Sequence, residues 1–482
     1  MNIVMKKILF IIWTISISLF CSCEDDVEYG VGDSSTIVFS VDTVNFDTVL
    51  SEVGSSTQRF KVFNENDKAV RFSQVRLASG GESGFLVNVD GESGAFFHDV
   101  SIYDKDSIFV FVKFEPKKQN NNLPVEVKDS LIFTLENGIE KSVIFYALVQ
   151  DAIVLKGVVV EDKMVLEGEK PYIVYDSLVV SPGALLEINN GVSLYFHNKA
   201  DLRVYGRILC NGVKDAPIVF RGMRTDKILP YLPYDRLDGQ WGGVRFYPES
   251  FENELHFTDI HGGRFGITCD NSILDATKLY MTNSSIHNVA ADALAMKYCS
   301  GVFVNCEFSN AKGNCVTLLG GDSQFLHCTM AQFYPWDASR GSALYFCNVL
   351  NDTIYPLERA DFINCLITGI SDDEVYGSRI DNNDAAFNCN FINCVVNTNI
   401  DDESSKEYFT NCTSENEDNE TYKSTNFRCI DTDNYVYDFR LDSLSVARKV
   451  GSAGYYEYAP NDKDGNPRPV NNPDVGCYQY VE

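Results

Sequence analysis

Basic residues are scarce in this chain of 482 residues. Lysine and arginine number 40 against 68 aspartates and glutamates, which gives a formal net charge of −28. Nucleic-acid phosphates and anionic lipid headgroups both need a basic footprint on their partner, so the composition argues against either one. An acidic surface in water accounts for the excess, and it permits calcium or a neutral glycan as a partner.

Long apolar runs are also lacking beyond the N-terminus. After Lys6 and Lys7, residues 8–20 form an uninterrupted run of mostly apolar side chains. This run is too short to span a bilayer, but it has the length of the apolar core of a signal peptide. No later run reaches the length that a spanning helix needs.

The apolar run ends in LFCSCEDD, in which Cys23 follows a small residue. The pattern resembles a bacterial lipoprotein signal with Cys23 as the lipidated residue, and Cys21 is the alternative. The acidic residues 24–26 resemble the surface-export tag of Bacteroidota lipoproteins. The resemblance implies a signal peptide over 1–22 and an export tag and linker over 23–35. It also implies a lipid-anchored outer-membrane protein that is exposed on the cell surface and reaches the membrane only through its lipid.

Cysteine is absent from residues 27–152, where strand-like runs alternate with turn residues. Apolar or alternating runs of strand length occur at 36–41, 59–64, 85–89, 107–114, 130–135 and 142–149. Asn137-Gly138 lies between two of them and is a strong hairpin signal. Short strands at such spacing predict a β-sandwich. FSVDTVNFDTV followed by GSSTQRFKVFN resembles the Ig-like modules found in Hydin-like proteins, which implies an Ig-like β-sandwich over 36–152 without catalytic residues.

A period of 22 residues organises the rest of the chain. NSSIHN, NCEFSN and HCTMAQ align so that Ser284, Cys306 and Cys328 share one column, with asparagine or histidine directly before each. Cysteine continues in that column at positions 365, 394 and 412. A fixed period in this range predicts a solenoid, in which each repeat buries its apolar face against its neighbours. Parallel strands stacked about 4.8 Å apart place like residues over like, so the asparagine column can form an amide ladder at a turn.

Alternation within one repeat predicts which side chains are buried. It sends Cys306 and Phe308 inward, and Asn305 and Glu307 outward. Coils of this length predict roughly a dozen turns. The later steps are longer, which implies insertions, and the candidate loops are 334–341 and 371–385.

Three further segments resemble right-handed parallel β-helix proteins. Leu202-x-Val204-x-Gly206-x-Ile208 resembles their first coils, GQWGGVRF (239–246) is a further match, and 438–480 resembles their C-terminal closing segment. The resemblance implies an all-β chain in which the N-terminal β-sandwich is followed by a right-handed parallel β-helix of the pectate-lyase-like superfold over 153–482. It is specific for architecture and implies little about activity.

The cysteines have two interpretations. Thirteen of the 15 remain if Cys21 leaves with the signal peptide and Cys23 carries the lipid. Their number is odd and their spacing is never C-x-x-C, which argues against zinc. We favour packing as small buried hydrophobes over one or more disulfides.

Outward polar residues of the coils are the candidates for chemistry. His261 and His287 each follow an inward isoleucine, so they are predicted to stack on neighbouring coils and face out. The charged residues near them are Asp259, Arg264, Asp292 and Lys297. β-Helix lyases and hydrolases use outward carboxylates with calcium and a basic residue. However, the sequence has neither the paired aspartates of polygalacturonases nor the Arg-x-Pro-x-x-Arg pattern of pectate lyases. Solvated coil residues are the simpler interpretation, and Arg468 is interpreted as structural. We therefore assign no catalytic residue, no metal ligand and no cofactor.

Two acidic stretches and one tripeptide pattern give weaker signals. Residues 371–384 and 401–420 offer carboxylates for calcium, but a solvated loop is the favoured interpretation because the spacing matches no calcium motif. Asp followed by Ser or Thr and an aliphatic residue occurs at 42–44, 47–49, 106–108, 129–131, 176–178, 352–354 and 442–444. The pattern resembles the O-glycosylation acceptor of exported Bacteroidota proteins. The alternative is that these pairs open strands after turns.

These features leave two main hypotheses for function. The first is a non-catalytic, lipid-anchored surface scaffold that binds a polysaccharide, a host glycan or another envelope component. The second is a polysaccharide lyase, hydrolase or epimerase, with its site near 259–297 or in the inserted loops at 334–385. The lack of an assembled catalytic motif favours the first. A purely structural envelope protein is a third hypothesis.

Overall fold

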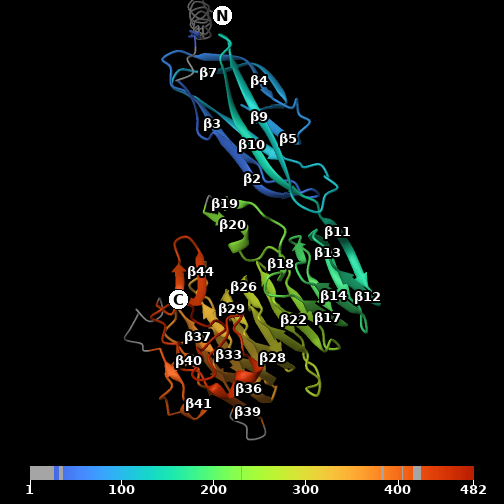
Figure 1. Cartoon of the computed structure of the whole chain (residues 1–482), viewed down its shortest axis with the longest axis vertical. Coiled ribbons are helices and arrows are strands. Elements are labelled where there is room, and N and C mark those ends of the chain that lie inside the picture. The colour runs from blue at the N-terminus through green and yellow to red at the C-terminus, as the bar shows by residue number, and fades with distance from the viewer. Residues whose placement is uncertain (1–26, 32–35, 230, 381–384, 404, 416–424) are drawn as a thin grey trace, which may run out of the picture. The chain divides into compact units, whose positions relative to one another are not determined.

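The computed structural model describes residues 27–31, 36–229, 231–380, 385–403, 405–415 and 425–482. The predicted signal peptide and Cys23 lie outside these residues. Regular structure is almost entirely β, which confirms the all-β prediction (Figure 1). Within the described ranges, no helix is long and apolar enough to cross a membrane. Two compact units are formed, one by the described residues up to Phe46 with Gly54–Lys117 and Glu126–Leu148, the other by Asp47–Val53, Lys118–Val125 and Val149–Glu482.

The N-terminal strands form two sandwich-like sheets of five strands each. The first has the order β1 (Ile37–Phe39), β3 (Gln58–Asn64), β8 (Ser107–Phe114), β5 (Phe85–Val89) and β6 (Glu92–Gly94). The second has the order β2 (Thr43–Leu50), β10 (Glu140–Gln150), β9 (Val125–Leu135), β4 (Val70–Leu77) and β7 (Phe96–Ile102). Strict alternation along β8 buries Ile108, Val110, Val112 and Phe114. The ring of Phe114 stacks on Phe85 with 4.3 Å between centroids. The predicted β-sandwich is therefore present.

The second unit is a parallel β-helix, as predicted, and it has three faces. Face A stacks β12 (Lys163–Leu166), β14 (Leu185–Asn189), β17 (Arg207–Asn211), β22 (Asn253–His256), β25 (Leu279–Thr282), β28 (Ser300–Val304), β31 (Gly321–Leu326), β36 (Leu357–Ile363), β39 (Phe387–Ile392) and β41 (Phe409–Thr410). Face B stacks β15 (Ser193–Phe196), β18 (Ile218–Gly222), β23 (Thr258–His261), β26 (Ser285–Val289), β29 (Glu307–Ala311), β32 (Thr329–Gln332), β37 (Leu366–Gly369), β40 (Val395–Val396) and β42 (Thr413–Ser414). Face C stacks β16 (Leu202–Val204), β21 (Val244–Phe246), β24 (Ile267–Cys269), β27 (Leu294–Lys297), β30 (Val316–Leu319), β33 (Leu344–Cys347) and β38 (Val375–Ser378). The stack opens with β11 (Ile153–Val160) and β13 (Tyr172–Val180), and β13 pairs with the first strands of both faces B and C.

Smaller elements leave this stack. They are the hairpins β19 (Lys227–Leu229) with β20 (Leu232–Pro233), β34 (Val349–Leu350) with β35 (Thr353–Ile354) and β43 (Phe427–Asp431) with β44 (Val436–Leu441), and the 3₁₀ turns η1 (Tyr234–Arg236), η2 (Lys406–Tyr408) and η3 (Ala453–Tyr458). The β34–β35 hairpin accounts for part of the long step from Cys328 to Cys365, and residues 333–343 account for the rest. Of these two insertions, only the second was predicted from the sequence, as 334–341; the other predicted loop, 371–385, belongs to the next step of the repeat.

The corner between faces A and B is set by the asparagine column. Its members have a left-handed backbone, with φ values of 50° to 54° at Asn283, Asn305, His327, Asn364, Asn393 and Asn411. Asparagine tolerates this conformation better than most residues, which explains its recurrence where the chain turns sharply. Asn305 Nδ2 donates to Asn283 Oδ1 at 3.1 Å, so the predicted amide ladder is present at this step.

The cysteine column supplies the second residue of this corner and packs in the interior. Cys306, Cys328, Cys365 and Cys394 are buried, and all 13 cysteines of the described residues are free thiols. Each Sγ in the column donates to a carbonyl of the preceding coil, for example from Cys328 to Phe303 O at 3.5 Å. Ser284 makes the equivalent contact through its hydroxyl. Small side chains with one donor therefore suit this column.

The C-terminal segment covers the later coils of face B. The outward residues Ala331, Phe333, Leu366 and Val395 are apolar there, and they pack against side chains from 427–478. Outward residues are therefore not all solvated: Asn305 is 4% exposed and Glu307 is 8% exposed. On the earlier strands β23, β26 and β29, the outward residues Asp259, Ser285 and Glu307 are polar, as are His261 and His287.

Arg468 fastens this segment to the coils. It is 3% exposed, and its guanidinium donates to Asn305 Oδ1, Asp474 O and Gly476 O at 3.0 to 3.1 Å. These contacts agree with the structural interpretation of Arg468.

His327 is the one imidazole in the asparagine column, and we expect it to make the β-helix sensitive to acid. Burial and the nearby Arg468 guanidinium hold the pKa of His327 well below 6.5, although the carbonyls of Gly476 and Asp474 oppose the shift. Below pH 6.5, the imidazole of His327 is therefore protonated in the unfolded chain but stays neutral in the folded chain. Stability conferred by neutral His327 is present above pH 6.5, and about 1.4 kcal/mol is lost for each pH unit below it, down to the folded pKa.

We expect His327→Asn to remove this dependence, because asparagine suits the corner and carries no proton. The measurement is denaturant unfolding of both proteins at pH 7.5, 6.0 and 5.0. The difference in unfolding free energy between them should change with pH in favour of the variant as the pH falls. A difference that stays constant from pH 7.5 to 5.0 would contradict the prediction.

Candidate functional site

Face B presents two outward polar columns where the apolar cover ends. The register pairs Asp259 with Ser285 and Ser285 with Glu307, which makes the first column. It pairs His261 with His287, and these two residues make the second column. The residues between the columns, Ile260, Ile286 and Phe308, are fully buried. Alternation on β23, β26 and β29 therefore aims these polar side chains away from the interior, as predicted.

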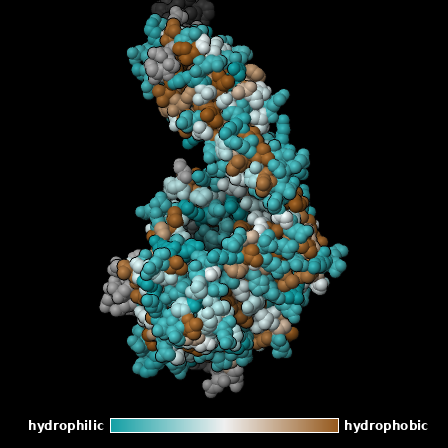
Figure 2. All heavy atoms as spheres, in the orientation of Figure 1, coloured by the Kyte–Doolittle hydropathy of each residue, from teal (hydrophilic) through white to brown (hydrophobic). Residues whose placement is uncertain are grey.

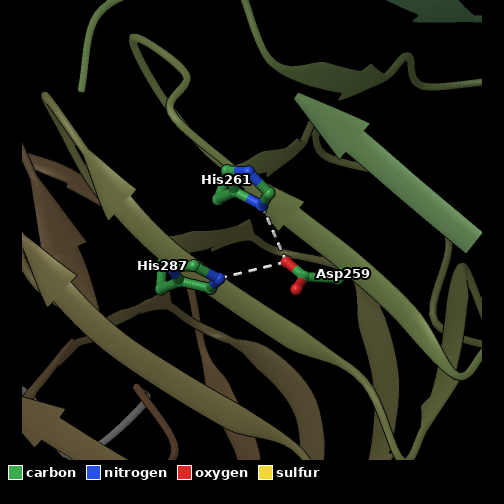
Figure 3. Close-up of side chains that lie close together, drawn as sticks. All are labelled: Asp259, His261 and His287. Atoms are coloured by element: carbon green, nitrogen blue, oxygen red, sulfur yellow. Dashed lines mark hydrogen bonds and ion pairs between the residues drawn. The ribbon is translucent and has the colours of Figure 1, made fainter. Parts of the chain in front are cut away.

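Asp259, His261 and His287 converge on one point (Figure 3). Asp259 Oδ1 lies 3.0 Å from His261 Nδ1 and 3.1 Å from His287 Nε2. The two imidazole rings stack with 4.9 Å between centroids and 20° between planes. The prediction that these histidines stack on neighbouring coils is confirmed. In the described part of the chain, this is the single group of three or more His, Cys, Asp or Glu side chains close enough to share one ion.

A loop beside face B adds a second carboxylate. Asp235 belongs to η1, and its Oδ1 lies 2.9 Å from His261 Nε2 and 2.8 Å from Arg221 Nη1. His261 therefore has a carboxylate at each ring nitrogen. Arg221 in turn balances the charge of Asp235.

These contacts set the charge state of the cluster. Burial opposes charge on His261, but the carboxylates of Asp259 and Asp235 outweigh it and raise the pKa of His261 to about 9. Burial likewise opposes the charge on Asp259, and the two histidines still hold its pKa well below the usual value. The same balance, with His261 and Arg221 as partners, lowers the pKa of Asp235. Without a ligand, the cluster is an ion-paired network at neutral pH.

Glu307 lies two coils from Asp259 and is held by the C-terminal segment. Its Oε2 accepts from the hydroxyl of Tyr478 at 2.7 Å and lies 4.0 Å from Lys463 Nζ. Its Oε1 accepts from Ser309 Oγ at 2.9 Å. Burial, with the Glu307 carboxylate adding to it, raises the pKa of Tyr478 well above 10.

Together these residues line one groove. It holds about 470 Å³ between the polar part of face B, the η1 loop and the β43–β44 hairpin. Figure 2 shows a hollow with a hydrophilic rim over β26, beside β44. The hairpin contributes Tyr435, Tyr437 and Arg440 to the wall. The site is thus built from the repeat on one side and from non-repeating segments on the other.

Two polar atoms in the groove lining have no partner among the described residues. They are the hydroxyl oxygen of Tyr437 and Oδ1 of Asn310, both shielded from solvent by the surrounding atoms. Buried polar groups in proteins are nearly always hydrogen-bonded, so each of these atoms gains a partner only when the lining shifts enough to admit one.

Three predicted site residues lie elsewhere. Arg264 donates to Asn198 O at 2.8 Å, and Asp292 accepts from the Asn314 backbone N–H at 2.9 Å. Lys297 lies on face C, with Nζ 5.6 Å from the centre of the Tyr355 ring. They neighbour the histidines in sequence, but the corner between faces B and C turns them away.

Asp235, Lys463 and Tyr478 were not predicted from the sequence, and Glu307 was not assigned to a site. Glu307 carried a signal, because the repeat places it in the column of Asp259 and Ser285. The other three come from segments without periodicity, and no pattern in the sequence marks them.

The acidic stretches do not form a calcium cluster in their described parts. Glu374 Oε1 and Oε2 accept from the backbone N–H groups of Ser371 and Ala343, both at 2.8 Å. Asp373 Oδ1 accepts from the Val375 N–H at 3.0 Å. Here the carboxylates order the loop between β37 and β38.

Comparison with known proteins assigns no family. No protein-family model and no curated protein matches the chain. The family 28 exopolygalacturonase of Yersinia enterocolitica aligns over 75% of this chain and 87% of its own, at 9% identity and a TM-score of 0.22. The periplasmic chaperone SfaE aligns over 24% and 57% at 12% identity and a TM-score of 0.17. A family 123 glycoside hydrolase from Clostridium perfringens aligns over 26% of each chain at 8% identity and a TM-score of 0.18. The chain thus spans under two thirds of the last two proteins.

Proposed function

We propose that this chain is a lipid-anchored surface protein that binds a glycan, without catalysis, in the polar groove of its β-helix. The observation that carries the proposal is the groove lining, where tyrosines of the β43–β44 hairpin face carboxylates and imidazoles of face B. Carbohydrates are recognised by such mixtures, because aromatic rings pack against sugar rings and fixed polar groups bind hydroxyls.

Tyr437→Ala tests this proposal, because it removes one aromatic ring from the groove wall. A sugar ring loses its packing partner, so we expect a glycan that binds the groove to bind the variant about tenfold more weakly. The measurement is titration calorimetry with the strongest binder from a panel of neutral and acidic polysaccharides. Tyr376→Ala is the matched control, because Tyr376 is 58% exposed and lies on face C outside the groove.

Two outcomes would count against the proposal. One is a panel without any binder. The other is a binder whose affinity falls equally in the two variants, since that would place its site outside the groove.

A second candidate function is a polysaccharide lyase, hydrolase or epimerase at the same groove. Asp259 between two imidazoles favours it, since such groups can move protons during bond cleavage. Release of reducing ends or unsaturated products, abolished by Asp259→Ala, would establish this candidate and overturn the non-catalytic proposal. Asp292 is no longer a candidate for that test, because its carboxylate binds backbone outside the groove.

The proposed surface location rests on the sequence pattern around Cys23. Incorporation of labelled fatty acid into the exported chain, but not into Cys23→Ala, tests the anchor. O-Glycosylation at the Asp-Ser and Asp-Thr sites is also a proposal. Thr43, Thr353 and Ser443 are exposed and therefore within reach of a modifying enzyme. A mass of the exported protein equal to chain plus lipid would exclude the modification.

A further inference from the structure

We propose that Asp259, His261 and His287 bind one divalent first-row transition-metal ion in the groove. The inference goes beyond glycan binding and does not depend on it. Two imidazole nitrogens and one carboxylate oxygen form the donor set, and imidazole favours zinc, iron, copper or nickel over calcium and magnesium. No metal ligand was predicted here from the sequence, where solvated coil residues were the simpler interpretation.

The spacing of the donor atoms fits a common ion. Zinc binds nitrogen and oxygen ligands at about 2.0 to 2.2 Å, so neighbouring ligand atoms around it lie roughly 3 to 3.5 Å apart. Asp259 Oδ1 lies 3.0 Å from His261 Nδ1 and 3.1 Å from His287 Nε2. All three donor atoms lie within 4.8 Å of one another. An ion can therefore replace the two bridging hydrogens with small movements of the rings.

A supporting contact holds His261 in the orientation that a ligand needs. Its Nε2 lies 2.9 Å from Asp235 Oδ1, and Asp235 is fixed by Arg221 at 2.8 Å. Histidines that bind metals usually donate their other ring N–H to a carboxylate, which leaves the first nitrogen free for the ion. Asp235 comes from η1, outside the coils of face B, so this contact is independent of the stacking that aligns the three ligands.

The groove gives the ion access and open coordination positions. The side chain of Asp259 is 36% exposed and that of His287 is 24% exposed, whereas His261 is 8% exposed at the back. Three protein ligands leave the remaining positions for water or a ligand in the groove, as in metal sites that act on bound molecules. The chain thus presents an ion to the occupant of the groove.

The test is calorimetric titration of the chelator-treated, full-length protein with Zn²⁺ alone at pH 7.5. We expect one ion per chain, at least 100-fold weaker binding in His287→Ala and Asp259→Asn, and about tenfold weaker binding in Asp235→Asn. His256→Ala is the matched control, because His256 also pairs with a carboxylate, Glu254 at 3.3 Å, but lies on face A. It should bind like the wild type.

A second measurement does not depend on the variants folding. Acylation of histidines by diethyl pyrocarbonate, read by mass spectrometry on the wild-type protein, should be suppressed by Zn²⁺ at His287 and unchanged at His256. Absence of zinc binding, equal binding by the wild type and His287→Ala, or equal protection of both histidines would overturn the proposal. A site that takes Ca²⁺ or Mg²⁺ in preference to Zn²⁺ would overturn it as well. None of these outcomes requires a glycan, so they leave the proposed function to its own test.

Discussion

Phe325→Ala should lower the unfolding free energy of the β-helix by about 4 kcal/mol, the typical cost of deleting a buried phenylalanine ring. Phe325 lies in the middle of an interior column of rings on face A. It is 4.6 Å from Phe303 on one side and 5.1 Å from Phe362 on the other, measured between centroids, with planes 12° to 13° apart. The column continues through Phe391 and Phe409 at 4.8 Å per step. Removing one ring leaves two neighbours facing a cavity.

Tryptophan fluorescence during denaturant unfolding is the measurement for this prediction. Trp13 belongs to the predicted signal peptide, and Trp241 and Trp336 both lie in the β-helix unit. The signal of the exported protein therefore reports on the β-helix rather than on the β-sandwich. Tyr376→Ala is the control, because that side chain is mostly exposed and its removal should change stability by less than about 0.5 kcal/mol. A loss below about 1 kcal/mol in Phe325→Ala would show that the coils collapse into the cavity.

Arg468→Ala should cost about 3 kcal/mol and should loosen the C-terminal segment before the rest of the β-helix unfolds. Its guanidinium supplies donors to one side-chain oxygen and two backbone carbonyls that would otherwise lie buried without partners. Because each coil contacts mainly its neighbours, loosening the C-terminal segment should leave the packing of distant coils intact. Hydrogen exchange should therefore accelerate in residues 427–480 while β14 and β17 stay protected.

The matched control for this experiment is Arg428→Ala. Arg428 belongs to the same segment but is exposed, and it donates a hydrogen bond to Val481 O at 2.9 Å. Its loss should leave both exchange and stability close to the wild type. Uniform acceleration across all coils in Arg468→Ala would mean that the cover and the stack unfold together, contrary to the expectation.

The β-helix could be predicted because its repeat relates residues that are only 22 positions apart in the sequence. The 22-residue step that aligns Ser284, Cys306 and Cys328 already sets which side chains enter the interior, and the three share one corner in the structure. His261 and His287 were predictable as a stacked pair by the same rule. The rest of the groove depends on contacts over long separations, such as Tyr478 with Glu307 and Asp235 with His261. No periodicity connects those residues, so the sequence alone could not bring them together.

The apolar residues at outward positions of face B were a second signal in the sequence, for the area that another segment covers. Ala331, Phe333 and Leu366 lie at outward positions of face B, where a solvated coil would carry polar residues. Their apolar side chains mark the area that the C-terminal segment covers, and the polar residues on earlier coils mark where the cover gives way to the groove. This difference was not used in the prediction, in which outward positions were taken to be solvated.

The corner between faces A and B also determines how the chain can change in length. From Asn283 to Asn411, two residues link the faces at each turn, whereas the insertions fall in the other two corners. Chain length can therefore vary without moving face B, and whole coils are the natural step by which this surface grows or shrinks. Duplicating residues 283–304 would extend the groove floor by one strand spacing, about 4.8 Å, while every existing corner kept its geometry.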